Sequence, residues 1–168
     1  MEQGLVDHLE AQGHASCAPT SIPENVVEAR PGVGLSSYWS LRHIAFVAGL
    51  GTFGISGGLI TRRGIAHRLG AVVTEAVIPP TPRAYGDDPL AWCLRSAKGL
   101  CGKCIDRCPA GSIGDSVAER DKTACREHSR RIRREGKDLY DWEGAYGCGL
   151  CQVGVPCEFT APTVKQGD

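Results

Sequence analysis

The chain has 168 residues, the size of one ordinary domain or of a small domain beside part of another. Hydrophobic residues make up 42% of it, enough for a buried core, and no apolar run is long enough to span a bilayer. Lys plus Arg and Asp plus Glu number 19 each, so the net charge does not indicate a polyanionic partner. The N-terminus lacks a signal-peptide core, so we expect a cytoplasmic protein with neither a membrane nor a DNA partner.

The first half of the chain has the mixed helix and strand pattern of an α/β domain. Residues 38–48 carry apolar side chains at the i, i+3, i+4 and i+7 positions, which predicts an amphipathic helix. The glycine-rich stretch 48–58 ends that helix. The other predicted elements are a short helix over 4–13, a brief strand over 14–19, and β-like runs over 58–64 and 71–78.

A proline-rich stretch, residues 78–89, is typical of a loop, so we place a domain boundary near Asp88. The predicted domains are therefore 1–88 and 89–168. The second domain has few core-forming residues and one strongly predicted helix, which begins at Asp121 and ends at Gly136. A segment this poor in apolar side chains needs a metal centre to fold stably.

Nine cysteines in a cytoplasmic chain favour metal binding or redox chemistry over disulfides. Cys17 stands alone and is most simply a small buried residue. The other eight lie in the second domain: Cys93, Cys101, Cys104, Cys108, Cys125, Cys148, Cys151 and Cys157.

The segment CGKCIDRCP, residues 101–109, matches the last three cysteines and the proline of the bacterial ferredoxin pattern C-x2-C-x2-C-x3-C-P. Where that pattern has its first cysteine, this chain has Lys98. The cysteine count supplies a replacement, because Cys93 lies slightly further upstream. We therefore expect Cys93 to act as the missing ligand from a longer loop.

Eight cysteines provide four thiolates for each of two 4Fe–4S cubes, one thiolate per iron. By analogy with the ligand exchange of two-cluster ferredoxins, we expect one set of Cys93, Cys101, Cys104 and Cys157, and a second set of Cys108, Cys125, Cys148 and Cys151. Pairing the first four and the last four cysteines is the alternative. Zinc bound by C-x2-C pairs is the alternative metal, although it would leave four cysteines without a partner.

With these residues in place, the chain from about Trp39 to Glu158 resembles the C-terminal portion of the epoxyqueuosine reductase family and its reductive-dehalogenase relatives. Its strongest parts are AGLGTFG (48–54), CGKCIDRCPAGSI (101–113) and GCGLCQVGVPCE (147–158). The resemblance implies an α+β protein, with a partial α/β reductase-type domain followed by a bacterial-type ferredoxin-like module holding two 4Fe–4S clusters. The sequence departs from the family at Thr52 and Ile55, where the reductases have tryptophan and lysine.

The resemblance also implies a cofactor. In such reductases the clusters feed electrons to a cobalamin that reduces a bound substrate, and the segment matching 48–54 runs close to the corrinoid. Gly49, Gly51 and Gly54 would then be corrinoid-binding residues, since glycine allows a backbone to approach a flat macrocycle. A purely structural turn is the alternative. The family's substrate-side aspartate has no match here, so the catalytic residues stay unassigned.

Two functions are consistent with these features. One is an iron–sulfur oxidoreductase that passes electrons through two clusters to a corrinoid or other acceptor, and the other is a ferredoxin-like electron carrier with no substrate chemistry. Both require a redox partner protein as electron donor. The helix after Asp121 has basic residues that form either a solvated face or a grip on tRNA phosphates: Arg126, Arg130, Arg133, Arg134 and Lys137. The histidines have no metal-type spacing, and His43 could face the core or a cofactor.

Overall fold

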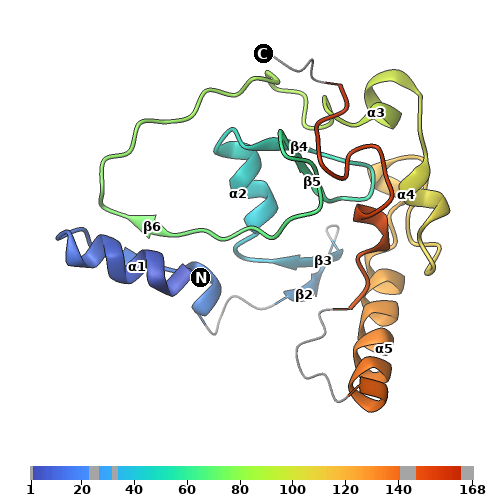
Figure 1. The fold of residues 1–168 in the computed structure, drawn as a ribbon, viewed down its shortest axis with the longest axis horizontal. Helices are drawn as coiled ribbons and strands as arrows, with labels where there is room; N and C mark the ends of the chain where they lie inside the picture. The colour runs from blue at the N-terminus through green and yellow to red at the C-terminus, as the bar shows by residue number, and fades with distance from the viewer. Residues whose placement is uncertain (1, 23–26, 32–33, 141–146, 164–168) are drawn as a thin grey trace. The chain divides into compact units, whose positions relative to one another are not determined.

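The structure, a computed structural model, describes residues 2–22, 27–31, 34–140 and 147–163 (Figure 1). Its α-helices are α1 (Glu2–Ala11), α2 (Leu41–Val47), α3 (Leu94–Lys98), α4 (Lys103–Asp106) and α5 (Lys122–Tyr140). Its 3-10 helices are η1 (Pro19–Ser21), η2 (Val117–Glu119) and η3 (Leu150–Gln152). Its strands are β1 (Ser16–Cys17), β2 (Val27–Arg30), β3 (Gly34–Ser37), β4 (Gly51–Phe53), β5 (Leu59–Thr61) and β6 (Val73–Thr74).

The described strands form three small antiparallel sheets of two strands each, β1 with β6, β2 with β3, and β4 with β5. The mixture of helices and strands agrees with the expected α+β composition. The ferredoxin-like character of the second half stays a prediction. By its internal contacts the chain divides into two compact units, Met1–Leu50 with His67–Ala84, and Gly51–Ala66 with Tyr85–Asp168.

This division differs from the domain boundary expected near Asp88. The second unit does begin again close to that point, at Tyr85, but it also takes in Gly51–Ala66, which the sequence analysis assigned to the first domain. The physical reason is burial, because this segment carries the most deeply buried aliphatic side chains of the second unit: Ile55, Leu59, Ile60 and Ile65, each 2% exposed or less. The unit that seemed poor in core formers therefore draws its core from upstream in the sequence.

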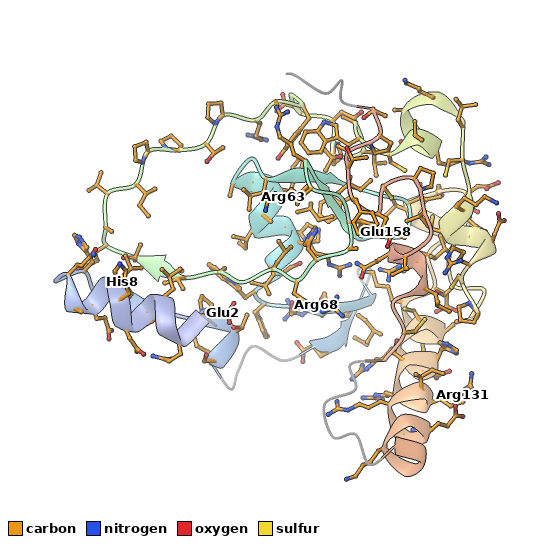
Figure 2. The ribbon with its side chains drawn as sticks, in the orientation of Figure 1. Glu2, His8, Arg63, Arg68, Arg131 and Glu158 are labelled. Carbon is orange, nitrogen blue, oxygen red and sulfur yellow. The ribbon has the colours of Figure 1, made fainter. Side chains whose placement is uncertain are left out.

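In the first unit, α1 and β1 confirm the predicted helix and strand. The backbone turns after α1 at Gly13, whose φ of 85° lies in the left-handed region that glycine adopts without strain. The carboxylate of Glu2, at the start of α1, accepts hydrogen bonds from the Thr20 hydroxyl and, at 2.8 Å, from the N–H of Ala71 (Figure 2). The Glu2 side chain thus joins three segments of this unit.

Helix α2 confirms the amphipathic helix expected over 38–48, with Ala45 as its buried residue. Cys17 was expected to be buried, and that expectation is wrong because its side chain is exposed. A strand in a two-stranded sheet alternates its side chains between two faces, and here Ser16 is half-buried whereas Cys17 points to the uncovered side. The β2–β3 hairpin and the short helices α3 and α4 were not predicted.

In the second unit, β4 and β5 form a hairpin that the chain 85–92 covers. The N–H of Phe53 donates to the carbonyl of Pro89 at 2.6 Å, and the N–H of Trp92 donates to the Thr52 hydroxyl at 3.0 Å. Tyr85 and Trp92 pack edge to face, with ring centroids 5.3 Å apart. These contacts fix the chain that leads directly into Cys93.

Helix α5 begins as predicted and ends later than predicted. Asp121 precedes it, and its carboxylate accepts the N–H groups of Thr123 and Ala124 at 2.9 Å each, as an N-cap should. The helix was expected to stop at Gly136 but continues to Tyr140. A glycine inside a helix costs only about 1 kcal/mol relative to alanine, which the helix-forming residues around it can outweigh.

Candidate metal centre

A cavity in the second unit brings together the cysteines that we name cysteine set I: Cys93, Cys101, Cys104 and Cys157. It encloses about 400 Å³ of space not filled by atoms, part of it open to solvent. Apart from the sulfurs its lining is mainly aliphatic, with Ile55, Ile60, Ile65, Leu94 and Val155 among the lining residues. All four cysteines expected to form one set therefore line the same cavity, with Cys157 beside cysteines far upstream, and their joint binding of a cluster stays a prediction.

Each cysteine of set I has a local structural reason for its position. Cys93 is 8% exposed and precedes α3 with extended backbone angles, so its side chain turns inward at the helix start. Cys101 has a φ of 76° and is the non-glycine residue with a positive φ in the described part of the chain. Such strained backbone persists where the surroundings demand it, often at ligand sites. Lys98, where the ferredoxin pattern has a cysteine, is exposed on α3.

Cys157 reaches this cavity because the turn that directly follows the β4–β5 hairpin holds its backbone. The N–H of Ile65 donates to the carbonyl of Cys157 at 2.8 Å. Gly64 has a φ of 88° and lies against Glu158, the residue that follows Cys157. A Cβ at position 64 would overlap the carbonyl oxygen of Glu158. The backbone of the turn after β5 thus directly contacts the backbone of the C-terminal segment. A larger residue at position 64 would prevent this contact.

The thiols of set I affect one another electrostatically. Burial, and after it the neighbouring thiolates of Cys104, Cys93 and Cys101, raise the pKa of Cys157 to about 12. Burial and then Cys93, Cys101 and Cys151 raise the pKa of Cys104 to about 11. Four thiolates could share this space only with a cation to balance their charge, which a thiolate-bound metal would supply. The donor set therefore fits a thiolate-bound metal centre.

The remaining four cysteines form cysteine set II: Cys108, Cys125, Cys148 and Cys151. They come from the end of α4, the first turn of α5 and the η3 segment. Burial raises the pKa of Cys151; the Arg120 guanidinium opposes that rise, and the thiolates of Cys125, Cys148 and Cys108 add to it. The charges of the other three cysteines of set II thus all act on Cys151, as those of set I act on Cys157.

The two sets adjoin each other. Helix α4, which carries Cys104, packs against η3, which carries Cys151, and Figure 1 shows α4 beside the red C-terminal segment. Across this contact the Nε of Arg107 donates to the carbonyl of Leu150 at 3.1 Å. Cys104 also feels the charge of Cys151, a member of the other set. Metal centres bound by the two sets would be neighbours.

Two residues beside set II were missed by the sequence analysis. Ser112 is 1% exposed, and both its hydroxyl, at 3.2 Å, and its N–H, at 3.4 Å, contact Sγ of Cys108. Burial would raise the pKa of Cys108, but these Ser112 contacts, the Ala110 N–H and the Arg120 charge together lower it. The CPAGS turn was a usable signal for Ser112, since it returns the chain to the cysteine. No sequence pattern pointed to Arg120.

The glycines predicted to bind a corrinoid are constrained by protein atoms nearby. A Cβ on Gly49 would lie 2.8 Å from the carbonyl oxygen of Thr81, and one on Gly51 would overlap the carbonyl of Ile60. Gly54 lines the cavity of set I. The two residues that depart from the family pattern have structural roles as well, because Thr52 is fully buried and Ile55 lines the same cavity. Corrinoid binding by these glycines stays a prediction.

Other predicted features take ordinary positions. His43 is exposed, and its Nδ1 forms a 2.7 Å hydrogen bond with the Ser40 hydroxyl. On α5 the side chains of Arg130, Arg133 and Arg134 are exposed, and Arg131 pairs with Glu135 on the outer surface (Figure 2). A tRNA contact through this helix stays a prediction.

Neither a single-ion site nor a membrane span is found in the described residues. No group of three or more Cys, His, Asp or Glu side chains there is arranged to hold one metal ion. No described helix combines the length and the apolar character needed to cross a bilayer.

Comparison with known proteins finds a partial likeness to one class of enzyme. The chain is 40% identical over 72 residues to the tetrachloroethene reductive dehalogenases of Desulfitobacterium hafniense and of Dehalobacter restrictus. The match covers 42% of this chain and 12% of each relative, so the chain spans only a small part of their length. No family model and no solved structure matches the chain. Over this stretch the chain is similar to reductive dehalogenases.

Proposed function

We propose that this chain is an iron–sulfur oxidoreductase of the epoxyqueuosine reductase-like type, which passes electrons through two 4Fe–4S clusters to a corrinoid or another acceptor. Cysteine sets I and II would each hold one cluster through four thiolates. A cluster supplies one-electron transfer, and two neighbouring clusters supply a short path for the electron. The observation that carries the proposal is the cavity lined by all four cysteines of set I.

Several features of the protein support this assignment. The eight thiols fall into two groups of four, which matches one thiolate per iron in each cube. The aliphatic lining around set I would limit the contact of a cluster with water, and solvent exposure is one of the factors that set a cluster's reduction potential. The partial likeness to reductive dehalogenases, together with the resemblance of 48–54 to a corrinoid-facing segment, favours a corrinoid as the acceptor.

The ferredoxin-like electron carrier remains the second candidate, because one observation favours it. Gly49 and Gly51 lie against backbone carbonyls of the protein itself. This close packing explains why both positions need glycine, without any bound ligand. In that case the first unit would serve to dock a partner, and the clusters would exchange electrons with an external protein.

Metal and corrinoid analysis of protein purified without oxygen tests both candidates. We expect about eight iron and about eight acid-labile sulfide per chain, and a brown colour that dithionite bleaches. Added cobalamin should bind and shift its visible absorption if the corrinoid reductase is right, whereas full clusters without cobalamin binding would favour the electron carrier. Stoichiometric zinc with no labile sulfide would refute both.

A further inference from the structure

One half-buried arginine, Arg120, lies between cysteine set II and the turn that follows β4. Its Nη2 points at Sγ of Cys125 at 3.8 Å, within hydrogen-bond range of a sulfur acceptor. On its other side, a Cβ on Gly57 would be 2.6 Å from Nη1 and 3.2 Å from Cζ. Gly57 therefore leaves the space that the guanidinium occupies, and its own φ of 73° suits glycine.

Within the described part of the chain, no carboxylate pairs with Arg120. Among the described residues no ion pair includes Arg120, and its Nε is buried without a hydrogen-bond partner. A cation held away from water is unfavourable unless anions lie close to it. The anions close to Arg120 are the thiolates of set II, three of which it influences: Cys108, Cys125 and Cys151.

Among the described residues that line the cavity of cysteine set I, the one cationic side chain is already paired. The arginine that lines its cavity, Arg95, has its guanidinium committed to Asp115 at 2.8 Å and to the carbonyl of Cys101 at 3.4 Å. The Asp115 carboxylate offsets part of the charge that Arg95 would present to the sulfurs. The two sets therefore differ in a way that the symmetric count of four cysteines each does not suggest.

We propose that Arg120 makes the cluster of set II the more easily reduced of the two, an inference that rests on the proposed function. Reduction adds one electron, and so one negative charge, to a cluster already bound by four thiolates. A cation within hydrogen-bond range of a ligand sulfur stabilises the added charge and raises the reduction potential. At equilibrium, an electron added to the pair of clusters would then reside mainly on the cluster of set II.

The test is a reduction titration of Arg120→Gln, monitored by electron paramagnetic resonance of protein that contains both clusters. The reduction equilibrium of one cluster should become at least tenfold less favourable, a fall of about 59 mV for one electron, while the other cluster is unchanged. The same fall should occur in a Cys93→Ala background, in which set I is already altered. Arg131→Gln removes an identical charge from the exposed surface of α5 and should shift neither potential.

Arg120→Lys separates charge from shape. The lysine keeps the positive charge, so the reduction potential of the affected cluster should stay close to the wild-type value. If Arg120→Gln loses part of its iron, Arg120→Lys should still keep the full iron content. Full clusters in Arg120→Gln with both potentials unchanged would overturn this inference and leave the proposed function intact. Equal shifts of both clusters, or the same loss of iron in the Lys and Gln variants, would overturn it as well. A wild-type protein without labile sulfide would refute the proposed function and this inference together.

Discussion

Replacing Gly64 with Ala tests whether the β4–β5 hairpin positions Cys157 as a cluster ligand. Gly64 lies in the left-handed region, where a residue with a Cβ is strained by about 1–2 kcal/mol. Its added Cβ would also overlap the carbonyl oxygen of Glu158. The overlap can be relieved only if the hairpin and the C-terminal segment move apart.

That movement would weaken the hydrogen bonds between the two segments. The N–H of Ile65 donates to the carbonyls of Cys157 at 2.8 Å and Glu158 at 3.2 Å, and the N–H of Ala66 donates to Glu158 at 3.2 Å. If these two N–H groups each lose their hydrogen bonding, the free energy of unfolding falls by about 1–3 kcal/mol. With the backbone strain, Gly64→Ala should lower the free energy of unfolding by about 2–5 kcal/mol, which an ordinary domain of about 5–15 kcal/mol survives.

Urea unfolding and iron analysis, both under anaerobic conditions, measure the two effects. We expect iron to fall from about eight to about seven or fewer per chain, because a displaced Cys157 leaves one iron without its thiolate. Gly86→Ala is the matched control, since Gly86 has a φ of 59°, lies in the same unit and has open space around its Cβ position. It should cost only the strain of about 1–2 kcal/mol and keep all the iron. If both variants lose the same stability and keep the same iron, the hairpin does not position Cys157.

Cys93→Ala should lose at least one of about eight irons, since one cube then keeps three thiolates, while Cys17→Ala should lose none; an unchanged iron count in Cys93→Ala would exclude it as a ligand. Thr52→Val leaves a buried backbone N–H without its acceptor and should lower the free energy of unfolding, measured in urea, by about 1–3 kcal/mol; a loss below about 0.5 kcal/mol would contradict that hydrogen bond. A side-chain hydrogen bond from Thr20 and a backbone N–H lower the pKa of Glu2 from its ordinary 4.5, so its contribution is present above that pH and disappears as the pH falls through the lower folded-state pKa. Glu2→Gln should accordingly lower the thermal unfolding temperature more at about pH 7 than at about pH 3; equal losses at both would refute this.

The grouping of the cysteines could be predicted because short spacings restrict the geometry of a chain. Two cysteines separated by two residues fall on one turn, so Cys101 with Cys104, and Cys148 with Cys151, each had to act together. Counting then identified Cys93 as the spare upstream cysteine, whereas the expected place of Cys157 in set I came from the ligand exchange of two-cluster ferredoxins. Helix α5 was predictable at its start, where Asp121 caps it, but its end was not, since Gly136 weakens a helix without stopping it.

The origin of the core around the cysteines could not be predicted from local pattern. Ile60 lies in the β4–β5 hairpin and Ile65 lies just after it. The sequence of this segment shows only short apolar runs, which do not indicate the unit in which the segment is buried. Their partners, such as Val155, are far away in the sequence, and periodicity carries no information about such pairings. The position of Arg120 beside set II could not be predicted for the same reason, because its neighbours Gly57 and Cys125 come together only in the folded chain.

The crossed arrangement of the cysteines also has a consequence for the order of events during synthesis. Set II needs Cys151 and set I needs Cys157, so neither group of four exists until the ribosome has made the chain through these late residues. The ribosome adds about 5–20 residues per second. Until it has added the late cysteines, the earlier cysteines have no complete set of four. If the two sets hold clusters as proposed, cluster delivery follows translation of the module, and a chain interrupted before Cys151 offers a delivery protein no finished site.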